Sequence, residues 1–218
     1  AETLSLAGRR VVVAEAKPSP ARKFLMAGKS GLNFTKAEPL ADFVAAYGDA
    51  ADWLAPMLRA FGPDEAVAWA EALGQEVFTG STGRVIPTAM KASPLLRAWL
   101  GRIDADLRLG WRWTGIDGPA WRFDARDGPR CLRPKVVVLA LGGASWRRLG
   151  SDGTWVPVLS ARGVDLAPFR PANMGLRVDW SPAMARWFGA PVKGLGLSAG
   201  GLSVRGEAAI SARGLEGG

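Results

Sequence analysis

The stretch VVVAEAKPSPARKFLMAGKSGLN, residues 11–33, decides the fold of this protein. It opens on three valines, a β-branched run typical of a strand, and Glu15 closes that run. Residues 1–7 before it are good helix formers, and Gly8 ends them. Helix, glycine, strand and acid in this order are typical of the second half of a dinucleotide-binding βαβ unit, where the acid accepts hydrogen bonds from a ribose. We therefore expect Glu15 to bind a ribose.

The same order of elements also fits an ordinary edge of an α/β sheet, in which a surface loop follows the strand. The G-x-G-x-x-G fingerprint that would make a nucleotide site specific does not occur in the sequence. On this stretch alone, both interpretations stay open.

Residues 22–35, RKFLMAGKSGLNFT, resemble a loop of the BaiN-like (aminoacetone-oxidase-like) family of NAD(P)/FAD-dependent flavoproteins. In that family the loop follows the ribose-binding acid and lies along the FAD. The resemblance implies that Lys29 lies next to the flavin, where it would stabilise negative charge on the reduced ring. With the ribose-binding acid, the cofactor-binding residues expected in this region are Glu15, Lys17, Arg22, Lys23, Gly28, Lys29, Ser30, Gly31, Leu32 and Asn33.

Residues 135–145, KVVVLALGGAS, form a second informative stretch. A continuous apolar run without alternation is typical of a strand covered on both faces in a parallel sheet. Two glycines follow it and would let a ligand approach the backbone closely. The stretch resembles the Ala-Thr-Gly-Gly motif that closes the FAD domain of the same family against the cofactor, with Leu141 in place of Thr. The resemblance adds Gly142 and Gly143 to the expected cofactor-binding residues.

The chain between these stretches predicts helices first and strands afterwards. Helical spacing of apolar residues runs through residues 39–73 and 93–103, and two short β-like runs between them indicate a hairpin. Residues 106–126 alternate apolar and polar side chains, which predicts a hairpin or meander. In flavoproteins with two dinucleotide-binding folds, a strand of this kind passes the adenine, and Trp113 would contact it. Cross-strand packing explains Trp113 equally well.

We expect an α/β fold: part of a two-dinucleotide-binding-fold (Rossmann-like) FAD domain with a helical insertion and the start of a β-rich inserted domain. Residues 163–180, GVDLAPFRPANMGLRVDW, predict a short strand, a crossing marked by prolines and another strand. In residues 194–210, glycines alternate with β-branched and aliphatic residues, which is typical of short antiparallel strands. The expected division is residues 1–38 for the first part of the FAD-binding domain, 39–104 for the helical segment, 105–168 for the β-meander and the second part of the FAD-binding domain, and 169–218 for the start of the β-rich substrate domain.

The composition excludes several kinds of site. The 218 residues include no histidine and a single cysteine, Cys131. Ser-His and Cys-His catalysis, imidazole ligation of metals, thiolate-rich metal sites and an internal disulfide are therefore excluded. No apolar stretch is long enough to span a bilayer, and the first residues are unlike a signal peptide. We expect a cytoplasmic protein with no membrane partner and no metal.

The formal net charge of +8 raises the alternative of an RNA-binding protein. The 28 Lys and Arg residues are, however, dispersed among 20 acidic residues, without a run of four basic residues. A net positive charge is equally compatible with an anionic dinucleotide as ligand. We therefore expect no nucleic-acid partner.

The chain starts at Ala1, within the expected helix, whereas a Rossmann unit needs a strand and a glycine-rich turn before that helix. We therefore expect an internal fragment of a longer protein, unable by itself to bind the cofactor. The resemblance implies that the parent protein is an FAD-dependent oxidoreductase that acts on a small molecule, with NAD(P)H as transient reductant. The alternative is a nucleotide- or FAD-binding module without turnover. The sequence assigns no catalytic acid or base.

Overall fold

The computed structural model of the chain describes residues 1–29, 31–170 and 174–217, so the expected site residue Ser30 lies outside the described residues. The chain divides into two compact units, Ala1–Leu166 and Ala167–Gly218. The fold is mixed α/β, as the sequence predicts. Within the described residues, no helix has both the length and the apolar character needed to cross a lipid bilayer.

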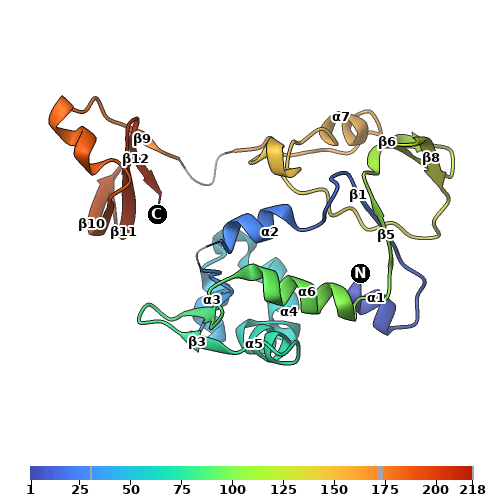
Figure 1. Ribbon diagram of the computed structural model, residues 1–218, viewed down its shortest axis with the longest axis horizontal. Coiled ribbons are helices and arrows are strands. Elements are labelled where there is room, and N and C mark those ends of the chain that lie inside the picture. The colour runs from blue at the N-terminus through green and yellow to red at the C-terminus, as the bar shows by residue number, and fades with distance from the viewer. Residues whose placement is uncertain (30, 171–173, 218) are drawn as a thin grey trace. The chain divides into compact units, whose positions relative to one another are not determined.

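The first unit contains a pair of parallel strands. β1 (Val12–Glu15) pairs with β5 (Asp106–Leu109), and Glu15 lies opposite Leu109. Parallel strands need a long crossover connection, which here runs through the helices between them (Figure 1). β1 follows the short helix α1 (Glu2–Leu6), as predicted.

The prediction that residues 106–109 belong to the meander is wrong. Their alternation of polar and apolar side chains marks a strand but does not specify its partner. Gly110, at φ +73°, turns the chain after β5. The amide of Trp111 then donates to the carbonyl oxygen of Glu15 at 2.9 Å, which extends the pairing with β1. The partner of β5 is therefore determined by contacts with β1, a segment far away in the sequence, and not by the residues next to β5.

A layer of helices with one small sheet makes up the crossover, and it confirms the helices predicted at residues 39–73 and 93–103. The small sheet has the antiparallel order β2-β4-β3, which confirms the predicted hairpin. The hydrophobic core cluster of this layer consists of the buried residues Leu32, Ala70, Leu73, Ala92 and Leu95. Its elements are α2 (Arg22–Ala27), β2 (Thr35–Lys36), α3 (Leu40–Ala45), η1 (Gly48–Ala50), α4 (Ala51–Ala60), α5 (Pro63–Glu71), β3 (Val77–Thr79), β4 (Arg84–Pro87) and α6 (Ala92–Arg102).

One carboxylate ties α1 to this helical layer. Glu2 Oε2 accepts hydrogen bonds from the indole nitrogens of Trp99 at 2.7 Å and Trp69 at 3.1 Å. Glu2 Oε1 forms an ion pair with Arg102 at 2.5 Å. Burial alone would raise the pKa of Glu2, but the hydrogen bonds from the two indoles and from Arg102, together with the charge of that guanidinium, hold the pKa below its usual value.

Gly28 packs the C-terminal end of α2 directly against α6. A Cβ at this position would lie 2.4 Å from the Cβ of Ala92, and the Ala92 amide donates to the Gly28 carbonyl at 3.1 Å. We expect Gly28→Val to lower the free energy of unfolding by about 1–3 kcal/mol, because the added carbons overpack a buried contact. Chemical denaturation of the variant and of the wild type measures this difference.

The double variant Gly28→Val/Ala92→Gly removes the methyl group that clashes, so we expect it to recover part of the lost stability. Gly101→Ala in α6 is the control, because a Cβ there meets no atom within 4 Å. That control is expected to gain about 0.5–1 kcal/mol, since glycine is unfavourable inside a helix. An unchanged unfolding free energy for Gly28→Val would contradict the packing role.

The predicted meander consists of β6 (Arg112–Asp117), β7 (Ala120–Ala125) and β8 (Gly128–Leu132), in this antiparallel order. Trp113 stacks on Trp121 with ring centres 5.3 Å apart. The indole nitrogen of Trp113 also donates to the backbone carbonyl two residues later at 2.9 Å. Cross-strand packing therefore accounts for part of the surface of Trp113.

Residues 135–141 are not the doubly covered strand that their apolar run predicts. They have no regular secondary structure, and no strand pairs with them among the described residues. Val136 and Val138 are 82% and 72% exposed. An apolar run forms a buried strand only where other elements cover it, and within the described residues the parallel sheet consists of β1 and β5 alone.

The second unit is an antiparallel sheet of order β10-β11-β12-β9, which confirms the strands predicted from the glycine alternation. That this unit begins a substrate domain stays a prediction. Its elements are β9 (Leu176–Arg177), η3 (Pro182–Trp187), β10 (Pro191–Ala199), β11 (Leu202–Ser211) and β12 (Gly214–Gly217).

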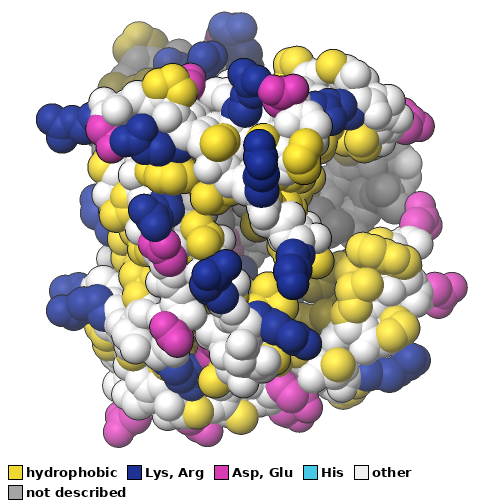
Figure 2. Space-filling view, turned by 90° about the vertical axis from the view of Figure 1, so that its right-hand side faces the viewer, with side chains coloured by type: hydrophobic (Ala, Val, Ile, Leu, Met, Phe, Trp, Pro, Cys, Tyr) yellow, Lys and Arg dark blue, Asp and Glu magenta, His cyan; other side chains and the backbone are white. Residues whose placement is uncertain are grey.

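Charges of both signs are mixed on the face of the molecule that Figure 2 shows. Figure 2 shows Lys and Arg side chains spread over one face, with acidic and apolar side chains between them. In the meander, Arg122 forms an ion pair with Asp117, and Arg130 forms one with Asp127. The absence of a nucleic-acid partner stays a prediction.

Candidate functional site

A pocket of about 440 Å³ lies beside the C-terminal end of β1. Ligands of α/β sheets bind at the carboxyl ends of parallel strands, so the fold itself favours a site here. A larger hollow of about 880 Å³ in the second unit contains none of the expected cofactor residues. The pocket at β1 is lined by Lys17, Arg112, Trp113, Thr114, Arg147, Asp152, Thr154 and Val158.

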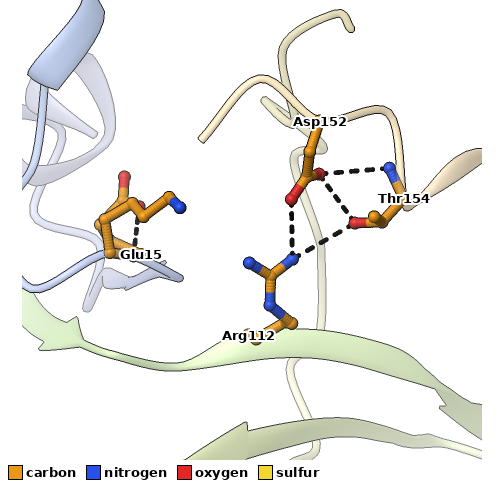
Figure 3. Close-up of polar contacts among 5 residues, drawn as sticks. Glu15, Arg112, Asp152 and Thr154 are labelled. Atoms are coloured by element: carbon orange, nitrogen blue, oxygen red, sulfur yellow. Dashed lines mark hydrogen bonds and ion pairs between the residues drawn. The ribbon is translucent and has the colours of Figure 1, made fainter. Parts of the chain in front are cut away.

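Glu15 ends β1 with a half-buried carboxylate. Its Oε1 atom accepts a hydrogen bond from the backbone amide of Lys17 at 2.7 Å (Figure 3). Its Oε2 atom has no hydrogen-bond partner among the described residues and is therefore left for a ligand. The stem of Lys17 lies against the glycine-rich turn at residues 150–153, because a Cβ on Gly150 would be 3.4 Å from its Cγ and Cε.

Arg112 connects β6 to that turn. Its Nη1 atom lies 3.1 Å from Asp152 Oδ2 and 3.3 Å from Thr154 Oγ1 (Figure 3). Asp152 Oδ1 in turn accepts hydrogen bonds from the hydroxyl and the amide of Thr154, at 2.8 and 3.2 Å. Burial alone would raise the pKa of Asp152, but these hydrogen bonds and the charge of Arg112 hold the pKa below its usual value.

The three cations of the pocket therefore differ in their availability. Arg112 is engaged by Asp152, whereas Lys17 and Arg147 have no ion-pair partner among the residues that the structure describes. The two latter side chains are the ones that an anionic ligand would meet without first breaking an ion pair.

Among the described residues, one hydrogen bond joins the two stretches that carry the family resemblance. Lys23, in α2, donates to Ser145 Oγ at 2.9 Å, shortly after the glycine pair. The structure thus brings the loop after β1 and the segment at residues 142–145 together, although they are far apart in the sequence.

The guanidinium group of Arg22 has one N–H donor, at Nε, without an acceptor among the described residues. Its Nη1 atom donates to Ser19 Oγ at 3.1 Å, but its Nε atom is buried without a hydrogen-bond partner among the described residues. Because an unsatisfied buried donor is costly, an oxygen atom of a ligand or of water is expected beside it.

The remaining expected residues of this loop do not line the pocket. Gly28 and Leu32 are buried in the core of the helical layer, where packing accounts for both. Lys29 and Asn33 are exposed, and Gly31 is half-buried. Their contacts with a cofactor stay predictions.

The glycine pair rests on a short loop between η2 (Arg147–Leu149) and α7 (Val156–Ser160). Gly142 has φ +70°, a conformation that glycine adopts without strain, and its carbonyl accepts a hydrogen bond from Trp155 Nε1 at 2.9 Å. A Cβ on Gly142 would lie 3.3 Å from Oγ of the buried Ser151. The main chains of Ser151 and Trp146 exchange two hydrogen bonds of 3.1 Å, which close the turn that contains η2.

Sequence reasoning missed several side chains of this site. For Asp152 the sequence does contain a signal: an acidic residue within the glycine-rich turn at residues 150–153 indicates a polar site. Arg112 and Trp155 give no such pattern, because folding alone brings their partners near. The missed residues are Arg112, Arg147, Asp152, Thr154 and Trp155.

Parallel strands joined by a crossover, with an acid and a pocket at the end of β1, define a Rossmann-type α/β domain. The chain belongs to the family described as HI0933-like protein Rossmann domain, whose model matches residues 1–215. The chain is also similar to 3-dehydro-bile acid delta(4,6)-reductase from Clostridium scindens, with 30% identity over 178 residues. That alignment covers 79% of the chain and 42% of the relative, so the chain spans less than half of that protein. These findings confirm the predicted family and fold class.

Proposed function

We propose that the chain is the FAD-binding part of an oxidoreductase that acts on a small molecule and takes its electrons from NAD(P)H. The position of Glu15 carries this proposal. Its carboxylate stands at the carboxyl end of a parallel strand, next to a pocket that contains an aromatic ring and cations. An adenine dinucleotide needs this combination for its ribose, its base and its phosphates.

The residues present fit FAD. Oε2 of Glu15 would accept hydrogen bonds from the ribose, Trp113 would contact the adenine, and the cations Lys17 and Arg147 would face the phosphates. The buried Nε of Arg22 lacks an acceptor, which an oxygen of the cofactor would supply. Bound FAD would supply the hydride chemistry, and the part of the protein would be to bind it, orient it and exclude water.

The relative supports the redox assignment. Its name describes a reductase that acts on a 3-dehydro-bile acid, which is a small organic molecule. A Rossmann-type protein of the same family that holds FAD would perform redox chemistry of the same kind, with the electrons supplied by a nicotinamide. We therefore propose a small organic molecule as the substrate.

The visible absorption spectrum of the full-length product of the gene tests this function. We expect a yellow protein that releases FAD on denaturation and whose flavin is bleached by NADH or NADPH without oxygen. A yellow protein that neither nucleotide bleaches would instead be an FAD-binding module without turnover. A protein that stays colourless after incubation with FAD would overturn the proposal.

A further inference from the structure

We propose that Trp155 is a positioning residue of the FAD site: its indole N–H fixes the Gly142–Gly143 peptide so that the amide of Gly143 is presented to an oxygen atom of the cofactor. This inference rests on the proposed function and names a residue that neither the sequence motifs nor the pocket lining includes.

The geometry of one peptide bond carries the inference. Trp155 Nε1 donates to the carbonyl oxygen of Gly142 at 2.9 Å. The carbonyl of Gly142 and the amide of Gly143 belong to the same peptide unit, which is trans, as are all peptide bonds that the structure describes. In a trans peptide the C=O and N–H bonds point in opposite directions. The indole therefore holds the amide of Gly143 pointing away from Trp155.

That amide is available as a donor. Gly143 is half-buried, and its N–H donates to no acceptor among the described residues. A backbone N–H is a strong hydrogen-bond donor, so an amide held in one orientation and without an acceptor among the described residues is suited to bind an oxygen atom of a ligand. Phosphate and flavin carbonyl oxygens are both acceptors of the kind it would bind.

The surroundings keep the peptide in place and favour negative charge. A Cβ on Gly142 would lie 3.3 Å from Ser151 Oγ, and the hydrogen bond from Lys23 to Ser145 holds the chain two residues after Gly143. Lys23 brings a cation to Ser145, two residues after the glycine pair, which favours an oxygen atom that carries negative charge nearby. Trp155 supplies the hydrogen bond that sets the direction of the amide itself.

The test compares Trp155→Phe with Trp146→Phe in the full-length protein. Both variants keep an aromatic ring, and the two positions flank the segment at residues 147–154. The indole nitrogen of Trp146, however, has no hydrogen-bond partner in the described part of the chain, and its side chain is exposed. We expect Trp155→Phe to weaken FAD binding about tenfold, the effect of losing one hydrogen bond to a charged group, and Trp146→Phe to leave it unchanged. Equal dissociation constants for the two variants would overturn the inference.

A spectroscopic readout separates positioning from mere support of the loop. In Trp155→Phe, a shift of the phosphorus NMR lines of bound FAD would assign the amide to the pyrophosphate, whereas a raised infrared frequency of a flavin carbonyl would assign it to the ring. If neither changes relative to Trp146→Phe, the positioning role is wrong.

A measurement on the wild type avoids the risk that a variant does not fold. We expect hydrogen exchange of the Gly143 amide to slow at least tenfold when FAD binds, because the amide gains an acceptor. Unchanged exchange at Gly143 in protein that does retain FAD would overturn this inference alone. A wild type without bound flavin would overturn the proposed function and this inference together.

Discussion

Glu15→Gln is expected to weaken FAD binding by about 10- to 100-fold. An ionised carboxylate that accepts hydrogen bonds contributes about 1.5–3 kcal/mol for each of them, and about 1.4 kcal/mol corresponds to a factor of ten in affinity. The glutamine keeps an oxygen to accept the hydrogen bond from the Lys17 amide, which is 2.7 Å long in the wild type. The local turn should therefore persist while the charge that receives the ribose hydroxyls is lost.

Fluorescence titration of the apoprotein with FAD measures this dissociation constant. Asp106→Asn is the matched control, because Asp106 lies on the neighbouring strand β5 and its exposed carboxylate has Arg108 as its one ion-pair partner within the described residues. The control should bind FAD like the wild type. Equal affinity of Glu15→Gln and Asp106→Asn would remove Glu15 from the cofactor site.

Glu2→Ala is expected to have the largest effect on stability, lowering the free energy of unfolding by about 2–4 kcal/mol. The substitution leaves two indole N–H groups and a guanidinium without the acceptor that they share in the folded protein. Hydrogen bonds to charged groups contribute about 1.5–3 kcal/mol each, but these share one carboxylate and are partly exposed to solvent. Urea denaturation at neutral pH measures the loss.

Glu71→Ala is the control, since Glu71 is exposed in α5 and has no ion pair among the described residues. It should change the unfolding free energy by less than about 0.5 kcal/mol. A loss for Glu2→Ala no larger than that would show that the carboxylate does not anchor α1.

The effect of Glu2→Ala also has a defined pH dependence. The pKa of Glu2 is lowered in the folded chain, so its stabilising contribution is fully present above its usual pKa of 4.5. The contribution is lost as the pH falls through the lowered value, because the folded carboxylate then takes up a proton. The stability difference between wild type and Glu2→Ala should therefore shrink in acid, and an undiminished difference there would contradict the role of the charge.

Local patterns predicted most of the elements correctly because each depends on neighbours in the chain. The helical spacing of residues 39–73, the alternation of β6 and β7, and the valine run of β1 each specify an element by its own side chains. The prediction is wrong at residues 135–141, where hydrophobicity alone indicates a strand. A strand also needs a partner, and hydrophobicity does not supply one.

The sequence by itself determined the family, the α/β class, and the acid at the end of β1, because these follow from residues a few positions apart. The tertiary structure alone decided that β5 is the partner of β1, that Gly28 serves packing against Ala92, and that Arg112 is held by Asp152. Each of these depends on two segments far apart in the chain coming within a few ångströms. No local propensity encodes such a meeting, since it results from the burial and hydrogen bonding of the whole unit.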